Sequence, residues 1–303
     1  MVRDGVLVIG SANMDLVVFV EKFPQPGETI FGKKIEMFPG GKGANQAVCC
    51  AKLGAKTFFV GKMGNDDFRK RLTSNMENEG VIIDHLFIDE NESTGTALIT
   101  VDGKGENEIV VISGSNMKLS QEDIKSKKEI FKNVKVVITQ LEIPTEAVLE
   151  TAKAANENGN IFILNPAPAQ ELPEKLLSMV DYLTPNETEL ELLSGLCVKD
   201  LKSIELASEV LLKKGVKNVI VTLGEKGAYL INKKRKEIFP ANKVNVIDST
   251  GAGDAFNGAL AFALSKGEEP GKAIKFANSV ASYSVTKMGA QSSIPVPDEL
   301  TAK

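Results

Sequence analysis

Residues 38–54 read FPGGKGANQAVCCAKLG, with three glycines in four positions followed by small and apolar residues. The small residues over 44–53 predict a helix that packs closely against a sheet. A buried strand, VLVIG at 6–10, comes earlier and ends at a glycine. Glycines let the backbone approach another group closely, so the turn at 40–43 needs such a neighbour. Together these features predict the first strand and helix of an α/β fold.

The alternation of strand and helix continues along the chain. Strand-like runs occur at 57–64, 134–142, 161–168, 181–186 and 218–224, and helix-like runs at 66–80 and 144–159. This rhythm predicts βαβ units and a largely parallel sheet covered by helices on both faces. Several strands end in polar residues, namely Glu142, Asn165, Asn186 and Thr222. Because ligands of open α/β sheets gather at the carboxyl ends of strands, we expect the site there.

Two regions depart from this alternation. Residues 16–38 and 95–113 alternate in the period of a strand, and ALITVDGKGENEIVVIS at 97–113 predicts a hairpin around a turn-rich centre. We expect these regions to pair as a discontinuous β lid, with residues 1–15, 39–94 and 114–303 forming the α/β core. Exposed strand edges in a small lid favour pairing, so a homodimer joined through the two lids is expected.

Composition limits the class of partner. With 303 residues, 43% of them hydrophobic, the chain can fill a sizeable core, and its net charge of −4 gives no basic surface for nucleic acid. No apolar run reaches the roughly 20 residues of a membrane span, and residues 1–10 are typical of a first strand, not of a secretory leader. Cys49, Cys50 and Cys197 lack metal-site spacing, and we interpret them as reduced structural thiols. We expect a cytoplasmic protein, with a nuclear location left open.

Two common nucleotide-binding motifs do not fit this sequence. GETIFGKK at 27–34 ends in lysine where a Walker A loop needs Ser or Thr, and it lies in a strand-patterned region. The pairs Gly41 and Gly43, and Gly251 and Gly253, both lack the third glycine of a dinucleotide fingerprint. A P-loop NTPase and a standard NAD enzyme are therefore disfavoured.

A second glycine cluster lies in DSTGAGDAFNGALAFAL at 248–264. Apolar residues at helical spacing follow Thr250, which predicts a helix that begins near Gly251. Free N–H groups and the helix dipole favour an anion such as phosphate there. Asp254 can accept a proton from a hydroxyl that attacks phosphorus, or it can be an acidic residue that caps the helix. Because His85 is the single histidine, we expect any base to be a carboxylate or a lysine.

Several motifs occur in a fixed order along the chain: GSANMD (10–15), PGET (26–29), GGKGANQA (40–47), QLE (140–142), NPAPA (165–169), PNETE (185–189), TLG (222–224), DSTGAGD (248–254) and GAQSS (289–293). In this order they resemble the ribokinase family of carbohydrate kinases. The resemblance covers essentially the whole chain and implies a three-layer α/β/α domain with a mostly parallel sheet and a β-sheet lid. It implies ATP-dependent phosphorylation of D-ribose at the 5-hydroxyl. Adenosine or another sugar is the alternative acceptor, with Phe19 and Phe31 available to flank a purine, and a binding protein without turnover is a third possibility.

The resemblance also implies which residues hold the sugar. These are Asn13, Met14, Asp15, Gly41, Lys42, Gly43, Ala44, Asn45, Glu142 and Asp254. Carboxylates and amides suit this role because each can satisfy several hydroxyl groups. Without the family, Asn13 and Asp15 would be interpreted as turn residues, Glu142 as a helix-entry carboxylate, and the glycines as a hinge between lid and core.

The remaining roles implied by the resemblance concern ATP, the cations and catalysis. ATP is expected to contact Asn186, Thr222, Leu223, Gly224, Glu225, Lys226, Gly227, Gly253 and Asn278. Glu189 is expected to hold Mg²⁺ through water. An activating K⁺ is expected at Asp248, Thr250, Ser284, Lys287, Gly289 and Ser293. Asp254 is the expected general base, and Gly251, Ala252 and Gly253 form the expected anion hole.

Overall fold

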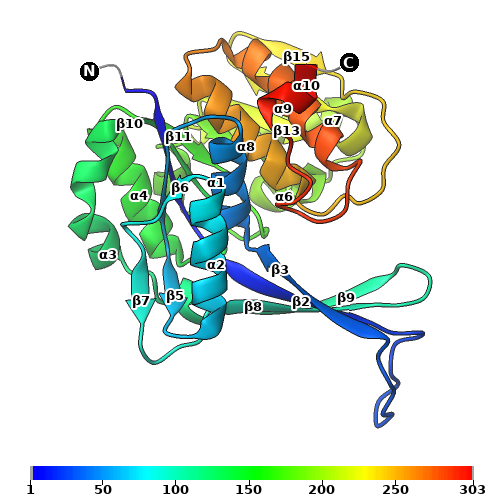
Figure 1. The fold of residues 1–303 in the computed structure, drawn as a ribbon. Helices are drawn as coiled ribbons and strands as arrows, with labels where there is room; N and C mark the ends of the chain where they lie inside the picture. Colours follow the sequence, from blue (N-terminus) through cyan, green and yellow to red (C-terminus); the bar gives the residue numbers. More distant parts are fainter. Residues whose placement is uncertain (1–2, 302–303) are drawn as a thin grey trace.

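The computed structural model describes residues 3–301, and within them a nine-stranded sheet runs through the centre of the molecule (Figure 1). Its strand order is β15-β14-β13-β12-β11-β10-β1-β4-β6. The strands from β13 to β6 are parallel, and β14 and β15 add an antiparallel edge. Their bounds are β1 (Gly5–Ile9), β4 (Thr57–Val60), β6 (Val81–Ile82), β10 (Val134–Thr139), β11 (Ile161–Leu164), β12 (Tyr182–Leu183), β13 (Asn218–Thr222), β14 (Ala228–Asn232) and β15 (Lys236–Phe239).

Helices cover both faces of this sheet. Successive residues of a strand point to opposite faces, and in the central strands the residues on both faces are apolar. Val6 and Val8 of β1 pack in one buried cluster, whereas Leu7 and Ile9 pack in the other. The first cluster includes α1 (Lys42–Lys52), α2 (Asp67–Asn78), α8 (Ala252–Ser265), α9 (Pro270–Ser284) and a residue of α10 (Pro297–Thr301). The second includes α3 (Gln121–Ser126), α4 (Thr145–Glu157), α5 (Glu174–Leu177), α6 (Glu187–Ser194) and α7 (Leu201–Lys213). The predicted fold class, a doubly covered α/β sheet with a smaller second sheet, is confirmed.

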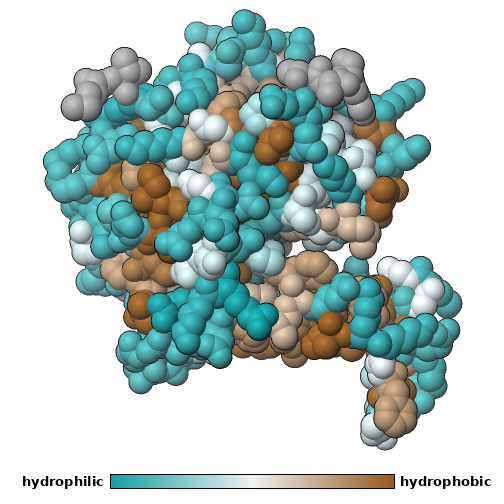
Figure 2. Space-filling view, in the orientation of Figure 1, coloured by the Kyte–Doolittle hydropathy of each residue, from teal (hydrophilic) through white to brown (hydrophobic). Residues whose placement is uncertain are grey.

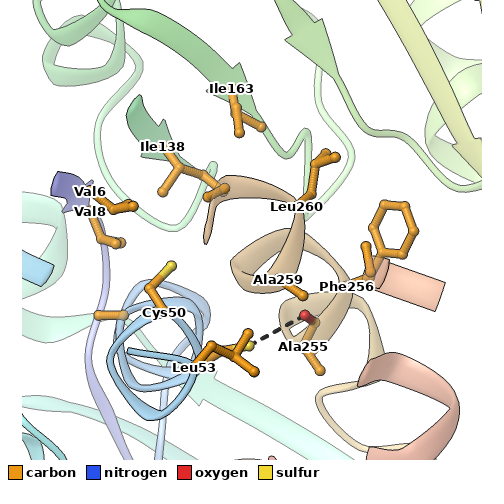
Figure 3. Packing of buried hydrophobic residues seen from close by; sticks show 14 of the residues in the cluster. Val6, Val8, Cys50, Leu53, Ile138, Ile163, Ala255, Phe256, Ala259 and Leu260 are labelled. Carbon is orange, nitrogen blue, oxygen red and sulfur yellow. Dashed lines mark hydrogen bonds between the residues drawn. The ribbon is translucent and has the colours of Figure 1, made fainter. Parts of the chain in front are cut away.

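Small residues bring α1 and α8 into close contact. Figure 3 shows Cys50 of α1 and Leu53, the residue that follows the helix, facing Ala255 and Ala259 of α8. The thiols of Cys49 and Cys50 donate to the carbonyls of Ala255 (3.4 Å) and Gly258 (3.2 Å). This contact places the N-terminal turns of two helices, which lie far apart in the sequence, at the same end of the sheet.

The lid is a four-stranded sheet of order β3-β2-β8-β9, which extends away from the core at the lower right of Figure 1. Its strands are β2 (Asn13–Phe19), β3 (Lys34–Gly40), β8 (Gly95–Val101) and β9 (Asn107–Ile112). The expected hairpin is present as the antiparallel pair of β8 and β9. β2 begins at Asn13 and β3 ends at Gly40, so both lid strands reach beyond residues 16–38 towards the core.

Some predicted elements differ from those observed. The run at 57–64 is divided between β4 and a short strand, β5 (Lys62–Gly64), which pairs with β7 (Phe87–Asp89) in a separate two-stranded sheet. The runs at 134–142 and 161–168 leave the sheet after Thr139 and Leu164, earlier than predicted. His85 packs against Phe58. Of the helices in residues 3–301, none combines the length and the apolar character needed to cross a bilayer.

Candidate active site

A cleft of about 170 Å³ lies at the carboxyl ends of the central strands. It combines residues from the glycine turn before α1, from the ends of β11, β12 and β13, and from the start of α8. The lining residues are Lys42, Asn165, Ala167, Thr184, Asn186, Glu189, Thr222, Ser249, Gly251, Ala252, Gly253, Asp254 and Asn257. The predicted position of the site, at this edge of the sheet, therefore agrees with the cleft.

The N-terminus of α8 forms one wall of the cleft. Gly251 is the N-cap residue and has a φ of +74°, a conformation that glycine adopts at little cost. A Cβ at this position would lie 2.8 Å from the Cβ of Ala290, so the neighbouring loop also requires glycine. The helix begins at Ala252, whose N–H donates to the carbonyl of Ser249. The N–H groups of Gly253 and Asp254 have no acceptor within the helix, so they can bind an anion in the cleft.

The side chain of Asp254 points to α1 and not to the end of its own helix. Its Oδ2 accepts a hydrogen bond from Asn45 Nδ2 (2.9 Å), and its Oδ1 accepts one from Gln46 Nε2 (3.0 Å). No side-chain capping bond is present at this end of α8, so the interpretation of Asp254 as a helix cap is not supported. Burial raises the pKa of Asp254, an effect that Lys42 and the two amides oppose.

The glycine turn at 40–43 packs against the chain between β1 and β2. Gly41 has a φ of +87°, and a Cβ there would lie 2.7 Å from the Cα of Ala12. The N–H of Ala44 donates to the carbonyl of Ser11 (2.8 Å). The close neighbour that the turn needs is therefore this segment of the protein itself. The turn thereby brings Lys42 to the cleft.

Lys42 is the cation at the centre of an acidic site. Burial alone would lower the pKa of Lys42, but Asp254, Glu142 and Glu189 together raise it above its usual value. The ammonium group is therefore charged at neutral pH. A fixed positive charge near the start of α8 can attract the phosphates of a nucleotide.

Asp15, Glu142 and Asp254 form an acidic cluster beside Lys42. Burial, followed by the charges of Glu142 and Asp254, raises the pKa of Asp15 to about 7. Glu142 is held in place because its Oε2 accepts hydrogen bonds from Ser11 Oγ and from the backbone N–H of Lys42. Three carboxyl groups in one place suit a ligand that carries several hydroxyl donors.

Residues 13–15 alternate across strand β2. Asn13 is buried, and its Oδ1 accepts a hydrogen bond from Asn116 Nδ2 (2.7 Å). The side chain of Met14 points to the opposite face and lies in the hydrophobic core, so it does not join the polar cluster. Phe31 is 97% exposed at the lid and therefore supplies no enclosed surface for a purine.

The residues expected to bind ATP lie partly around the cleft. Asn186 and Glu189 cap α6 reciprocally: Asn186 N–H donates to Glu189 Oε2 (2.9 Å), and Glu189 N–H donates to Asn186 Oδ1 (2.8 Å). Thr222 pairs with Asn186 in an isolated bridge, and residues 224–226 form a single 3₁₀ turn beyond it. Asn278 lies outside the cleft lining, and its amide donates to the carbonyl of Phe239 (2.8 Å). Burial is the main cause that raises the pKa of Glu189.

Asp248 joins the two loops that were expected to hold K⁺. Its Oδ1 accepts the N–H of Thr250 (2.9 Å), and its Oδ2 accepts the N–H of Gly289 (2.8 Å). Ser284 and Lys287 are joined by a backbone hydrogen bond at the end of α9. Within residues 3–301, no group of three or more His, Cys, Asp or Glu side chains has a metal-binding arrangement.

Several polar residues that support the site were not predicted from the sequence. Ser11 and Asn116 hold Glu142 and Asn13, and Gln46 and Gln291 contact the side chains of Asp254 and Asn45. Gln46 lies inside the motif GGKGANQA, and Gln291 lies inside GAQSS. For Gln46, the signal available was a polar residue on the buried face of a helix rich in small and apolar residues.

Comparisons with known proteins agree with the motifs. Residues 3–297 match the model of the pfkB family carbohydrate kinases. The chain is 41% identical to the ribokinase of Haemophilus influenzae over 297 residues, which are 98% of this chain and 97% of that protein. It is 38% identical to the deoxyribokinase of Salmonella typhi over 291 residues, with 96% and 95% of the two chains covered. The structure of Arabidopsis thaliana ribokinase complexed with ribose and ATP matches with a TM-score of 0.94 at 36% identity, covering 99% and 98%. The chain therefore belongs to the pfkB family of carbohydrate kinases.

Proposed function

We propose that this protein transfers the terminal phosphoryl group of ATP to the 5-hydroxyl of D-ribose. The observation that carries the proposal is the position of Asp254, whose buried carboxylate lies in the first turn of α8 and near the other two carboxyl groups of the acidic cluster, Asp15 and Glu142. A base between a phosphate site and a hydroxyl-binding site can accept the proton of a hydroxyl group that attacks the bound phosphate. The similarity to a ribokinase that was solved with ribose and ATP supports the same pair of substrates.

The chemistry follows from these positions. Asp254 accepts the proton of the 5-hydroxyl while the hydroxyl oxygen forms a bond to the γ-phosphorus, and the bond from that phosphorus to the bridging oxygen of ADP breaks. The backbone N–H groups of Gly251 and Gly253, together with Lys42, would stabilise the charge on the transferred group, whereas the N–H of Ala252, the third expected member of the anion hole, already donates to the carbonyl of Ser249. Positioning and electrostatics supply most of the rate, and the base contributes about 10² to 10⁴.

The sugar would be held by carboxylates of the acidic cluster and by two asparagines near them. We assign its hydroxyl groups to the side chains of Asn13, Asp15, Asn45 and Glu142, with the backbone of residues 41–44 beside them. The adenine and ribose parts of ATP are assigned to residues 222–227 and to the neighbourhood of Asn278, and its phosphates to Asn186 and the start of α8. A site that pairs these hydroxyls rejects sugars that leave its buried polar groups unmatched.

The cations are part of the same proposal. Glu189 uses only one carboxylate oxygen in its capping bonds, so the other suits a hydrated Mg²⁺ in the cleft. The residues assigned to K⁺ are Asp248, Thr250, Ser284, Lys287, Gly289 and Ser293, and their carboxylate, hydroxyl and carbonyl oxygens suit a hard monovalent cation. When bound, Mg²⁺ would neutralise charge on the ATP phosphates, and K⁺ would place a positive charge beside the loop that precedes α8. Turnover measured with K⁺ and with Na⁺ tests the second assignment.

2-Deoxyribose is the second candidate acceptor. The similarity to a deoxyribokinase, at 38% identity, favours this alternative. Adenosine is less favoured, because the exposed Phe31 offers no enclosed surface for a purine. A coupled assay of ADP production with D-ribose, 2-deoxyribose, adenosine and fructose phosphates separates these possibilities. The proposal expects the highest kcat/KM for D-ribose. Selective turnover of another acceptor would contradict it, and ligand-dependent stabilisation without ADP production would indicate a binding protein.

The lid supports a proposal about assembly. Strand β9 is an edge strand whose residues are all exposed, and four consecutive ones are apolar: Ile109, Val110, Val111 and Ile112. Figure 2 shows brown side chains on the arm at the lower right, apart from the core. Such an edge favours pairing with a second copy. We therefore propose a homodimer joined through lids formed by residues 16–38 and 95–113, with the rest of the chain as the core.

The free thiols of Cys49, Cys50 and Cys197 support a cytoplasmic location.

A further inference from the structure

Two chains of side-chain amides converge on the carboxylate of Asp254. In the first, Gln140 Nε2 donates to Gln46 Oε1 (2.6 Å), and Gln46 Nε2 donates to Asp254 Oδ1 (3.0 Å). In the second, Asn75 Nδ2 donates to Gln291 Oε1 (2.7 Å), and Gln291 Nε2 donates to Asn45 Oδ1 (2.9 Å). Asn45 Nδ2 then donates to Asp254 Oδ2 (2.9 Å). Each carboxylate oxygen is therefore the end of one chain.

All five hydrogen bonds point in the same direction, with each amide donating towards Asp254. In such a chain every amide is polarised by the one before it, which strengthens the last N–H as a donor to a negative charge. Hydrogen bonds to a charged acceptor are also stronger than those between neutral groups. The two chains therefore favour the ionised form of Asp254, which is the form that can accept a proton.

Burial keeps this arrangement in place. Gln46 and Gln140 are completely buried, and Asn45 and Gln291 are each 6% exposed. The second N–H of Gln46 is directed to Asn165 Oδ1 (3.2 Å), so rotation of the Gln46 amide would leave two buried acceptors without a donor. An unsatisfied buried polar group is costly, so the amide has one favourable orientation.

We propose that Gln46 and Gln291 are positioning residues for phosphoryl transfer, which act by fixing the orientation and the ionised state of Asp254. Gln46 contacts the base directly, and Gln291 acts through Asn45. The chains come from separate parts of the fold: Gln140 follows β10, Asn75 lies on α2, and Gln291 lies in the loop after α9. Both glutamines are buried, and both ends of each amide are engaged by protein groups, so neither is expected to touch a substrate. This inference rests on the proposed role of Asp254 as the base.

The charged and titratable groups around Asp254 oppose one another. Lys42, on α1, favours the ionised carboxylate, whereas Glu142, after β10, disfavours it. Burial and the charge of Asp254 both raise the pKa of Asp15 on β2 and of Glu189 on α6. Burial also raises the pKa of the Cys49 thiol on α1. Lys42 is thus the single cation among these five groups, and the amide chains supply additional stabilisation of the charge.

The first test compares Gln46→Met and Gln291→Met with the unchanged protein. Methionine keeps the length of the side chain and removes its donors and acceptor. In each variant we expect kcat at pH 7 to fall about tenfold, while KM for ATP changes less than threefold. Loss of a donor disfavours the ionised carboxylate, so the acid limb of the kcat profile should move to higher pH by about one unit.

A control separates this effect from general loss of stability. Asn160 is also a buried amide, but it donates to the carbonyls of Phe131 and Val134 at the opposite end of the sheet. Asn160→Leu should lower the melting temperature and leave kcat and the acid limb unchanged. Should Gln46→Met fail to fold, Gln140→Met leaves Gln46 in place but removes its donor, and a smaller shift of the acid limb in the same direction is expected.

The second test does not use activity. With ¹³C-carboxyl-labelled aspartate, the signal that disappears in Asp254→Asn reports the pKa of Asp254 in the ligand-free protein. The inference expects this pKa to rise in Gln46→Met and in Gln291→Met but not in Asn160→Leu. An unchanged pKa and an unchanged kcat in both glutamine variants would overturn the inference, even if Asp254 is the base. Normal turnover of Asp254→Asn would instead overturn the proposed function.

Discussion

Asn45 and Asp254 are 209 residues apart in the sequence, yet Asn45 Nδ2 lies 2.9 Å from Asp254 Oδ2. The contact exists because α1 and α8 pack closely through small residues, with the Cys49 thiol bonded to the carbonyl of Ala255. The position of the proposed base therefore depends on the packing of two helices. Substitutions at two glycines of α8 distinguish an effect on this packing from an effect on phosphate binding.

Gly258 lies where α8 approaches α1. A Cβ at this position would lie 2.8 Å from Cys49 Sγ and 2.9 Å from the carbonyl oxygen of Gln46. We predict that Gly258→Ala lowers the free energy of unfolding by about 1–3 kcal/mol, because overpacking outweighs the gain of about 1 kcal/mol in helix propensity. Urea denaturation measures this difference. A variant as stable as the unchanged protein would show that the helices can separate at little cost.

Gly253 provides the matched comparison within the same helix. A Cβ at this position meets no atom within 4 Å, so Gly253→Ala should fold with unchanged stability. The added methyl group would project into the proposed phosphate site and hold the anion away from the backbone N–H groups. We predict a loss of at least about tenfold in kcat/KM for ATP, because complete removal of one such donor typically costs about 10² to 10³ in rate. Unchanged kinetics would place the phosphates elsewhere.

Asp15 should make stability depend on pH. Burial, followed by the charges of Glu142 and Asp254, raises its pKa in the folded protein to about 7 from an ordinary value of 3.8. The folded state therefore binds the proton more tightly than the unfolded state, and this group's contribution to stability falls as pH rises from about 4 to 7. Asp15→Asn lacks this fall, so the variant should gain about 1–3 kcal/mol relative to the unchanged protein above pH 7.

Urea denaturation of both proteins at a series of pH values measures the effect. The stability difference should be small below pH 4 and reach its plateau near pH 7. A difference that stays constant across this range would mean that the carboxylate of Asp15 is not destabilised by burial and by its acidic neighbours. The same variant should also bind D-ribose more weakly, since one hydroxyl-binding carboxylate is lost.

The proposed lid dimer predicts a change of mass in solution. Ile109 and Val111 lie on one face of β9, and both are exposed. Ile109→Lys combined with Val111→Lys should convert a dimer to a monomer, because like charges would face each other across the interface. Leu206→Lys, on the exposed surface of α7, is the control and should leave the mass unchanged. Sedimentation measurements in which the unchanged protein is monomeric would contradict the dimer.

The sequence was sufficient for the fold class because its signals are local. Buried runs such as VLVIG and the small residues of α1 predict their own structures, and the first turn of α8 begins as expected from residues 250–253. β14 and β15 were not predicted as a hairpin. β15, with the sequence KEIF, is short and largely polar and carries little strand signal of its own.

The site was only partly predictable for a different reason. Asp254 and the glycine turns belong to recognisable motifs, whereas the role of Gln46 depends on contacts with Gln140 and Asn165, which are distant in the sequence. Met14 illustrates the opposite case, since a motif suggested a sugar contact and the alternation of β2 turned its side chain into the core. Long-range packing decides both residues, and no local pattern contains that information.

The central claim is that Asp254 accepts the proton of the sugar hydroxyl. Its most direct test is the turnover of Asp254→Asn with D-ribose and ATP, measured together with the binding of both substrates by calorimetry. The account predicts that kcat falls by about 10² to 10⁴ while both substrates still bind with dissociation constants within about tenfold of the original. A variant that binds both substrates and retains a near-normal kcat would contradict it.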